Sequence, residues 1–300
     1  MDKVTNTFKV SERRKEVWNT ELEMLEIFKS ICDQEGIKYF AIGGTLLGAV
    51  RHNGYIPWDD DLDVVMLRED YDQFIEAAKK KMPDGFFLQI PETEDDYFFG
   101  HAKIRKNNTT AIRFIQYPER YSHHQGVFLD IFPLDRIPDN PILYKIHKYI
   151  ALKLMQIVYY AKYYYRLNKH SLITKIKHRF CTIILPSNKS IRRAFNIFEW
   201  WIKLPQKKTK RIGQISTYYH KDHVYSWETE WFNESIEHVF ENTTISIPRE
   251  YDKILTKTFG DYMKPVRVAS EHGEVYFDLH HDYTEYISGK RVFTENDLVL

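Results

Sequence analysis

The sequence predicts an α+β fold, a β-sheet covered by helices, with a basic helical insertion in the middle of the chain. Near the N-terminus, apolar residues recur every three to four positions, as in a helix. Several short apolar runs bounded by Gly and Pro follow, as in strands. A long aromatic and basic segment then precedes the C-terminal third. The 300 residues suffice for one elaborated domain or two smaller ones.

The elements can be assigned in chain order. A helix is predicted from about Ser11 to Gly36, and a strand over residues 38–42 follows it. The next elements are a strand ending at residue 67, a helix over residues 69–82, and strands over residues 86–90, 98–105, 109–114 and 126–132. Pro133 marks the exit into the insertion. Pro248 is placed for the first turn of a helix that stops at Gly260.

The most informative feature is a glycine pair, Gly43 and Gly44, followed by an acidic run. Asp59, Asp61 and Asp63 have the same parity, so on a β-strand their carboxylates leave one face. Three anions on one face need a cation, and an all-oxygen set without a nearby Cys favours Mg²⁺ or Mn²⁺. The pattern predicts a phosphoryl-transfer site in which substrate phosphates share the metal.

Two other interpretations of the acidic run are disfavoured. An EF-hand loop beginning at Asp59 would need Gly at its sixth position and Glu at its twelfth, where this chain has Val64 and Asp70. A solvated acidic loop would not continue directly into an apolar run such as residues 62–67. Acidic residues at the end of a buried strand indicate a site at the edge of a sheet.

Three segments match the pattern of one protein family. The first reads GGTLLGAVRH at residues 43–52 and IPWDDDLD at residues 56–63, and the second reads GVFLDIFPLD at residues 126–135, with KIR at residues 103–105 between them. The third and weakest spans residues 231–263. Together they resemble the LicD (fukutin-related) family of phosphocholine and related phosphoalcohol transferases. The middle of the chain has no counterpart in this resemblance.

The resemblance implies a nucleotidyltransferase-like core with a mixed sheet, and it assigns roles to motif residues. Asp61 and Asp63 are the expected principal metal ligands, Asp130 the third carboxylate, and Asp59 a further ligand or supporting group. Asp61, Asp63 and Asp130 are also the expected catalytic residues. The residues expected to bind the donor phosphates are Gly43, Gly44, Thr45, Arg51, His52, Lys103 and Arg105. Three histidines, His101, His123 and His124, are expected at the surface or in loops.

The implied reaction is metal-dependent transfer of phosphocholine, or a related phosphoalcohol, from CDP-choline or another CDP-alcohol. The acceptor would be a hydroxyl of a glycan or lipid-linked glycan precursor of teichoic acid, lipopolysaccharide or capsule, and CMP would leave. The aromatic residues that could recognise choline are Trp58, Tyr121, Trp227 and Trp231. Two alternatives stay open: transfer of a nucleoside monophosphate to a small-molecule or sugar hydroxyl, and a non-enzymatic protein that binds membranes or polyanions.

The overall charge of +1 hides a strongly basic segment. Residues 140–198 contain no Asp or Glu but many Lys, Arg and Tyr. Charged residues interrupt the apolar stretch before it can span a bilayer, so no transmembrane helix is predicted. An interfacial helix in peripheral contact with a membrane and an insertion packed on the core both stay open. No groove-reading motif accompanies the charge, so a nucleic-acid partner is not expected.

The predicted organisation is a catalytic core with its N-terminal helix over residues 1–137, the insertion over 138–210, and a part completing the core over 211–300. Cys32 and Cys181 are too few for a disulfide framework or a zinc site. The first residues are polar and lack the apolar run of a secretory signal. We therefore expect a cytoplasmic protein that can reach the inner face of the membrane.

Overall fold

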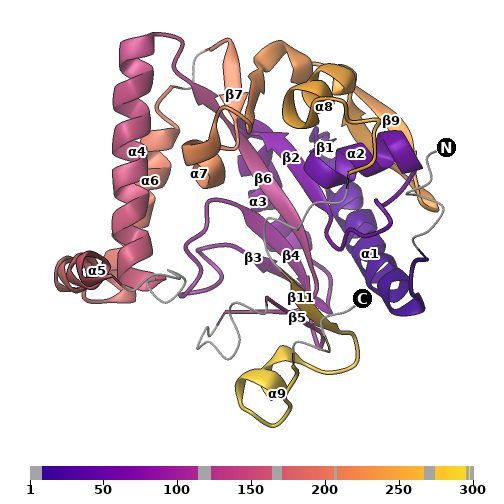
Figure 1. Ribbon diagram of the computed structural model, residues 1–300, viewed down its shortest axis with the longest axis horizontal. Helices are drawn as coiled ribbons and strands as arrows, with labels where there is room; N and C mark the ends of the chain where they lie inside the picture. The colour runs from indigo at the N-terminus through magenta and orange to yellow at the C-terminus, as the bar shows by residue number, and fades with distance from the viewer. Residues whose placement is uncertain are drawn as a thin grey trace. The chain divides into compact units, whose positions relative to one another are not determined.

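Figure 1 shows the computed structural model, which describes residues 9–113, 123–163, 171–205, 208–266, 274–294 and 297. The chain divides into two compact units. Unit 1 comprises Met1–Gln89, His101–Pro133 and Glu230–Leu300, and unit 2 comprises Ile90–Gly100 and Leu134–Thr229. The three-part division expected from the sequence stays a prediction.

Helices and strands occur in both units, and the predicted α+β fold is confirmed. The sheet of unit 1 has the strand order β1-β2-β6-β4-β3. The bounds are Phe40–Ala41 for β1, Asp63–Leu67 for β2, Phe86–Gln89 for β3, Ala102–Lys106 for β4 and Phe128–Ile137 for β6. The pairs β1 with β2, β3 with β4, and β4 with β6 are antiparallel. The inner strands β2 and β6 therefore carry Asp63 and Asp130.

The N-terminal helix α1 spans Glu12–Glu35, as the apolar spacing predicts. The Ser11 side chain caps it by accepting a hydrogen bond from the backbone N–H of Arg14, and Gly36 ends it with a left-handed φ of 66°. Helix α1 packs against α3 (Arg68–Lys81) and β4 (Figure 1). These local signals lie within the helix and its caps, which is why the sequence was sufficient to place it.

The other elements of unit 1 are β5 (Thr110–Arg113) paired with β11 (Val275–Asp278), the hairpin of β9 (Ser235–Phe240) and β10 (Thr243–Pro248), and the helices α2 (Gly43–His52), α8 (Tyr251–Phe259) and α9 (Tyr283–Ile287). The prediction that Pro248 opens a helix is wrong. Pro248 ends β10 opposite Ser235, and a proline without an N–H is tolerated at such a strand end. Helix α8 begins three residues later, at Tyr251.

Strand β6 does not end before Pro133, as the sequence predicted, but continues to Ile137. Residues 128–131 pair with β4, and residues 135–137 pair with β7 (Arg211–Gly213). Pro133 lies between these two stretches, where β6 changes partners. A proline cannot donate a ladder hydrogen bond, and at a change of partner this costs little.

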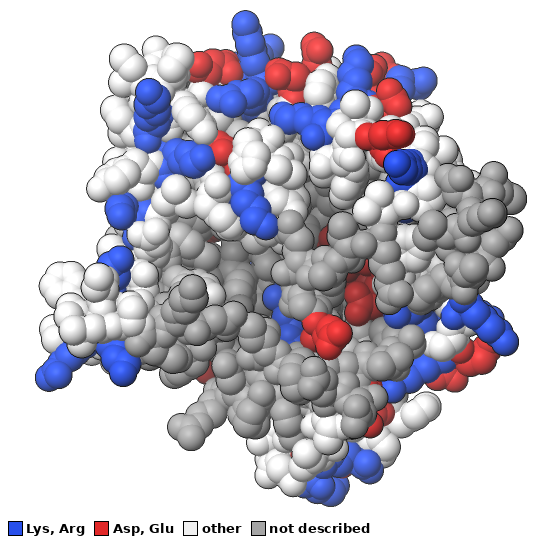
Figure 2. All heavy atoms as spheres, viewed as in Figure 1, with Lys and Arg blue, Asp and Glu red and all other residues white. Residues whose placement is uncertain are grey.

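Unit 2 contains the basic segment as helices. Besides the end of β6, it contains α4 (Pro141–Lys162), α5 (Leu172–Ile184), α6 (Asn188–Ile202), β7, α7 (Ile215–Tyr218), a 3₁₀ helix (Tyr219–Lys221) and β8 (Ser226–Glu228). Helix α4 begins where Asn140 accepts hydrogen bonds from two backbone N–H groups and Pro141 takes the first helical position. Figure 2 shows Lys and Arg side chains along this helix. Among the described helices, none is both long enough and apolar enough to cross a bilayer.

His124 holds two segments of unit 1 together in its neutral form. Its Nδ1 accepts the Gly126 N–H at 3.1 Å, so its Nε2 carries the proton and donates to Asn107 Oδ1 at 3.0 Å. The ring stacks on Phe87 at a centroid distance of 5.2 Å. Burial, assisted by the charge of Arg105, lowers the pKa of His124 to about 3. Protonation would remove the acceptor for Gly126.

We therefore expect acid to destabilise this unit partly through His124. The unfolded chain protonates His124 near pH 6.5 and the folded chain only near pH 3, so stability present above pH 6.5 is lost as the pH falls between these values. The slope is at most about 1.4 kcal/mol per pH unit. Urea unfolding at pH 7, 6 and 5 should show a shallower loss for His124→Gln than for wild type. The exposed His223→Gln is the control, and an unchanged slope in His124→Gln would contradict the assignment.

Candidate active site

The glycine pair brings the start of α2 against two carboxylates. Gly43 begins the helix with a φ of 58°, a conformation that favours glycine. A Cβ at Gly43 would lie 3.7 Å from Asp63 Oδ2, and a Cβ at Gly44 would lie 2.4 Å from Asp59 Oδ2. The second distance is too short for any contact between carbon and oxygen. The pair thus allows the positive end of α2 to approach these acids.

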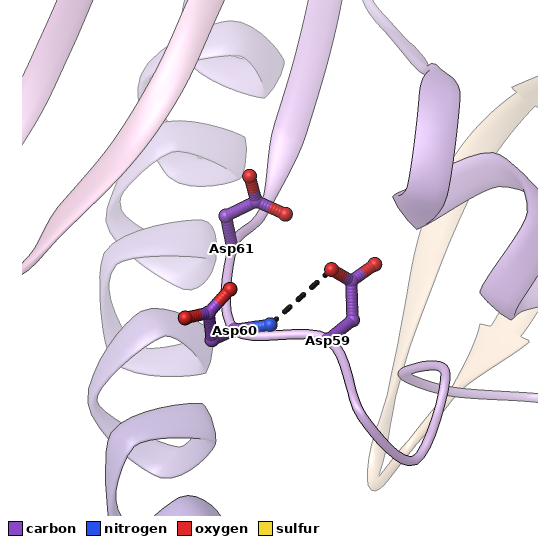
Figure 3. A group of neighbouring side chains, drawn as sticks. All are labelled: Asp59, Asp60 and Asp61. Carbon is purple, nitrogen blue, oxygen red and sulfur yellow. Dashed lines mark hydrogen bonds between the residues drawn. The ribbon is translucent and has the colours of Figure 1, made fainter. Parts of the chain in front are cut away.

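Asp59, Asp60 and Asp61 form a compact carboxylate cluster in the turn before β2 (Figure 3). One carboxylate oxygen of each lies within 4.8 Å of the others, and the Asp60 N–H donates to Asp59 Oδ1 at 3.3 Å. The prediction that Asp59, Asp61 and Asp63 share one strand face is wrong, because β2 begins only at Asp63. The backbone turns before β2 and brings consecutive acidic residues together. The cluster therefore also contains Asp60, whose side chain a strand would have placed on the opposite face.

Helix α1 holds this turn in place. Arg14 Nη1 and Trp18 Nε1 both donate to the backbone oxygen of Asp59, at 2.8 Å and 3.0 Å. The sequence analysis did not find these residues, because a contact to a backbone oxygen leaves no motif. The acidic turn is therefore fixed from the N-terminal helix, more than 40 residues away in sequence.

Thr45 connects α2 to the first residue of β2. Its side chain is buried, and Oγ1 accepts the Asp63 N–H at 2.8 Å. This contact fixes the backbone of Asp63 beside Gly43. Burial, followed by the charges of Asp61 and Asp130, raises the pKa of Asp63 well above its usual range. The carboxylates of β2, its preceding turn and β6 thus concentrate negative charge in one place.

Asp130 on β6 lies in a buried ion pair. Lys103 is its directly paired residue on β4, and Lys103 Nζ donates to Asp130 Oδ1. His101 Nε2 lies 3.4 Å from the same oxygen, and its ring lies 4.7 Å from the Phe132 ring. His101 and His123 are both buried, and both lie outside the strands in connecting segments, which agrees with the loop position expected for them. Sequence reasoning did not predict the contact between His101 and Asp130, because that contact depends on the register of β4 on β6.

The pKa values of both members of the ion pair are shifted. Burial would raise the pKa of Asp130, but Lys103 and the hydrogen bond of His101 outweigh it and hold that pKa far below its usual range. Burial lowers the pKa of Lys103 to about 7, although Asp130 acts in the opposite direction. Asp130 is therefore ionised at neutral pH and accepts a hydrogen bond from Lys103 Nζ.

The other predicted basic residues contact protein groups. Arg51 Nη1 donates to the Tyr262 backbone oxygen at 2.8 Å, and Arg51 Nε donates to His52 Nε2 at 2.9 Å. Arg105 is buried and donates to Gln89 Oε1 at 2.8 Å and to the Gly126 oxygen at 2.6 Å. Roles for Arg51, His52, Lys103 and Arg105 in phosphate binding stay predictions.

Glu21 is an acidic residue that the sequence analysis overlooked. It lies almost fully buried on α1, where burial and then the charge of Asp61 raise the pKa of Glu21 well above its usual value. Its position three residues after Trp18, within the apolar stripe, was the available signal. The Trp18 ring, on the same helix, stacks on the Tyr55 ring with a centroid distance of 4.7 Å.

The candidate choline-binding aromatics that the structure describes lie on different elements. Trp227 is buried within β8 of unit 2, whereas Trp58 precedes the acidic turn in unit 1 and Trp231 lies in a short 3₁₀ helix over Thr229–Phe232. Tyr121 lies outside the described residues. Trp58 is the one of these four that is adjacent in sequence to the carboxylate cluster.

The donor set fits a hard divalent cation. The cluster supplies carboxylate oxygens alone, partly accessible, with further carboxylates on β2 and β6. Oxygen ligands are the preferred environment of Mg²⁺ and Mn²⁺, which also keep positions for substrate phosphates. The fit rests on the chemistry of the donors and on the absence of side chains at Gly43 and Gly44, which leaves room beside Asp59 and Asp63.

Comparison with known proteins finds a matching domain model and several relatives. Residues 36–172 match the nucleotidyltransferase domain model of LicD/FKTN/FKRP. The chain is 29% identical over 248 residues to the lipopolysaccharide cholinephosphotransferase LicD of Haemophilus influenzae, covering 81% of this chain and 88% of that protein. A 40-residue stretch is 45% identical to the human ribitol 5-phosphate transferase FKRP, covering 13% of this chain and 8% of that protein.

A third relative, the uncharacterized protein RP689 of Rickettsia prowazekii, is 46% identical over 122 residues, which are 38% of this chain and 44% of that protein. The matched domain, residues 36–172, contains every carboxylate of the candidate site except Glu21. The comparisons therefore confirm the resemblance to the LicD family that the motifs indicate.

Proposed function

We propose that this protein is a metal-dependent transferase that moves phosphocholine, or a related phosphoalcohol, from a CDP-activated donor to a hydroxyl of a cell-surface glycan precursor. One observation supports this above the others: the segment that matches the family domain is the segment that gathers the carboxylates beside α2. The activity in the name of the Haemophilus influenzae relative, a cholinephosphotransferase, supports this substrate class. The protein would act in the cytoplasm, where CDP-alcohols are made.

In the proposed reaction the acceptor hydroxyl oxygen attacks the distal phosphorus and its proton passes to a carboxylate of the site. The bond between that phosphorus and the bridging oxygen breaks, and CMP leaves with the electron pair. Asp59, Asp61, Asp63 and Asp130 would hold Mg²⁺ or Mn²⁺, which would neutralise the diphosphate. Asp130 suits this role because Lys103 keeps it ionised. Positioning and charge stabilisation would then supply most of the acceleration.

Gly44→Ala should weaken the binding of Mn²⁺ by about 10- to 100-fold, because the added methyl group displaces Asp59 Oδ2 from a distance of 2.4 Å. Isothermal titration calorimetry with Mn²⁺ measures this. Asp84→Asn is the control, because it removes an exposed carboxylate outside the cluster and should leave the Mn²⁺ affinity unchanged. Equal Mn²⁺ affinity in Gly44→Ala and wild type would show that Asp59 is not a ligand.

The direct test is release of CMP from CDP-choline with Mg²⁺ or Mn²⁺ and a crude glycan-precursor acceptor, comparing wild type with Asp61→Asn. The acceptor is followed by mass spectrometry. Acceptor-dependent CMP release with phosphocholine on the glycan, lost in Asp61→Asn, is the expected result. Nucleoside monophosphate on the acceptor would support the alternative nucleotidyltransferase reaction.

The phosphoalcohol is tested in the same assay. CDP-ribitol, CDP-glycerol and CDP-ethanolamine replace CDP-choline, since the relatives differ in the group that their names specify. The donor with the highest kcat/KM identifies the alcohol. A folded protein that binds Mn²⁺ but releases CMP from none of the four donors would overturn the proposed reaction.

A further inference from the structure

Helix α5 of unit 2 exposes a continuous apolar face. Its six large apolar side chains with high exposure are Leu172 (75%), Ile173 (65%), Ile176 (60%), Phe180 (63%), Ile183 (69%) and Ile184 (52%). At 3.6 residues per turn they fall within an arc of about 120°. The opposite side of α5 packs on α4, where Cys181 is buried and His178 Nδ1 lies 2.8 Å from the Tyr160 oxygen. The helix is thus packed on one side and apolar on its exposed side.

Basic residues border this face on both sides. Lys177 lies at one edge of the apolar arc and Arg179 at the other, with Lys175 next to it, and all three are exposed. No acidic residue occurs anywhere in residues 140–198. Where Figure 1 draws α5, Figure 2 shows uncharged atoms edged by Lys and Arg. An apolar face bordered by cations complements a surface that is apolar inside and anionic outside.

We propose that α5 docks in the interface of an anionic lipid bilayer, lying parallel to its plane with the apolar face among the acyl chains. Such helices combine an apolar face with Lys and Arg at the headgroup level. Thirteen residues span about 20 Å, less than the apolar core of a bilayer, so α5 lies on the membrane and does not cross it.

A second copy of the chain is a poorer occupant of the face. A two-fold interface uses the same patch on both subunits, so the basic borders of the two copies, formed by Lys175, Lys177 and Arg179, would meet one another. Like charges in such contact are unfavourable. The proposal goes beyond the transfer reaction and does not depend on it, because membrane binding can be measured without donor, acceptor or metal.

The test is co-sedimentation of the full chain with phosphatidylcholine vesicles that do or do not contain phosphatidylglycerol. We expect binding to the anionic vesicles that weakens in 0.5 M salt, because salt screens the attraction between the basic side chains and the anionic headgroups. We expect little binding to phosphatidylcholine alone. The triple variant Ile173→Ser, Ile176→Ser, Phe180→Ser should bind at least about tenfold more weakly. The triple variant Lys175→Gln, Lys177→Gln, Arg179→Gln should lose about 10- to 100-fold.

A matched control removes three exposed apolar side chains from α4 instead, as Ile142→Ser, Leu143→Ser, Ile146→Ser, and should bind like wild type. All of these side chains are exposed, so circular dichroism should show folded variants. Wild-type binding by the α5 variants, or an equal loss in the α4 control, would overturn the proposal. A dimer in light scattering that the apolar α5 variant abolishes, without vesicle binding by wild type, would assign the face to a second copy.

Discussion

Asp63→Asn is expected to lower turnover by at least about a hundredfold, the scale on which single charge-stabilising groups act in catalysis. Asp63 begins β2 beside Gly43, close enough to Asp61 and Asp130 for their charges to raise its pKa. Asparagine keeps the shape of the side chain, and the Asp63 N–H that Thr45 accepts is unchanged. The loss should therefore come from the missing negative charge at the metal, measured as initial rates of CMP release.

The same substitution should raise the free energy of unfolding of the metal-free protein. Because the pKa of Asp63 is higher in the folded than in the unfolded chain, ionisation at neutral pH costs folding stability. Asparagine resembles the protonated form and avoids this cost. Urea unfolding without metal measures it, and opposite changes in activity and stability would identify a residue that is kept for function.

Asp84→Asn is the control, since Asp84 is exposed in the turn between α3 and β3. It should change neither turnover nor stability. Mn²⁺ should stabilise wild type against urea more than it stabilises Asp63→Asn, because a bound ligand favours the folded state. Near-normal turnover in a folded Asp63→Asn protein would remove Asp63 from the proposed metal site.

The elements that sequence analysis placed best are those with local signals. Helix α1 has its cap at Ser11 and its stop at Gly36, both within a residue of the helix itself. The strand that carries Asp130 was found because its apolar run is local too, although its end at Ile137 was not. The end depends on pairing with β7, some 75 residues later, which no local pattern reports.

At the candidate site, too, sequence analysis succeeded only where the signal is local. The motif identified Gly43, Gly44 and the acidic run, and the structure brings them together. The parity argument failed at Asp60 because it assumed a strand where the chain turns. The partners His101 and Lys103 reach Asp130 through the register of β4 on β6, a non-local property that single-sequence patterns do not contain.

Lys103→Met is expected to destabilise the folded protein by about 3–5 kcal/mol, the usual cost of leaving a buried charge without its partner. The Lys103 and Asp130 side chains are each only 7% exposed. Methionine is one atom shorter than lysine but keeps an unbranched apolar side chain beside the Phe128 ring, over which Lys103 Nζ lies at 3.9 Å. The measured loss should therefore report the charge. Urea unfolding at neutral pH gives the value.

The double variant Lys103→Met, Asp130→Asn should recover most of that loss, because no uncompensated charge remains in the sheet. Lys79→Met is the control: Lys79 pairs with Glu76 on an exposed helix face, where such a pair contributes less than about 1 kcal/mol. These three variants separate the charge of the buried pair from the general effect of replacing lysine.

A small loss in Lys103→Met, similar to that of Lys79→Met, would contradict a structural ion pair. Lys103 would then be free to act on donor phosphate, as the family resemblance implies, and the variant should show a raised KM for the CDP donor. A large loss that the double variant reverses would instead mean that Lys103 acts through Asp130. In that case Lys103 serves the site by keeping one carboxylate ionised inside the sheet, which is the state that a cation requires of its ligand.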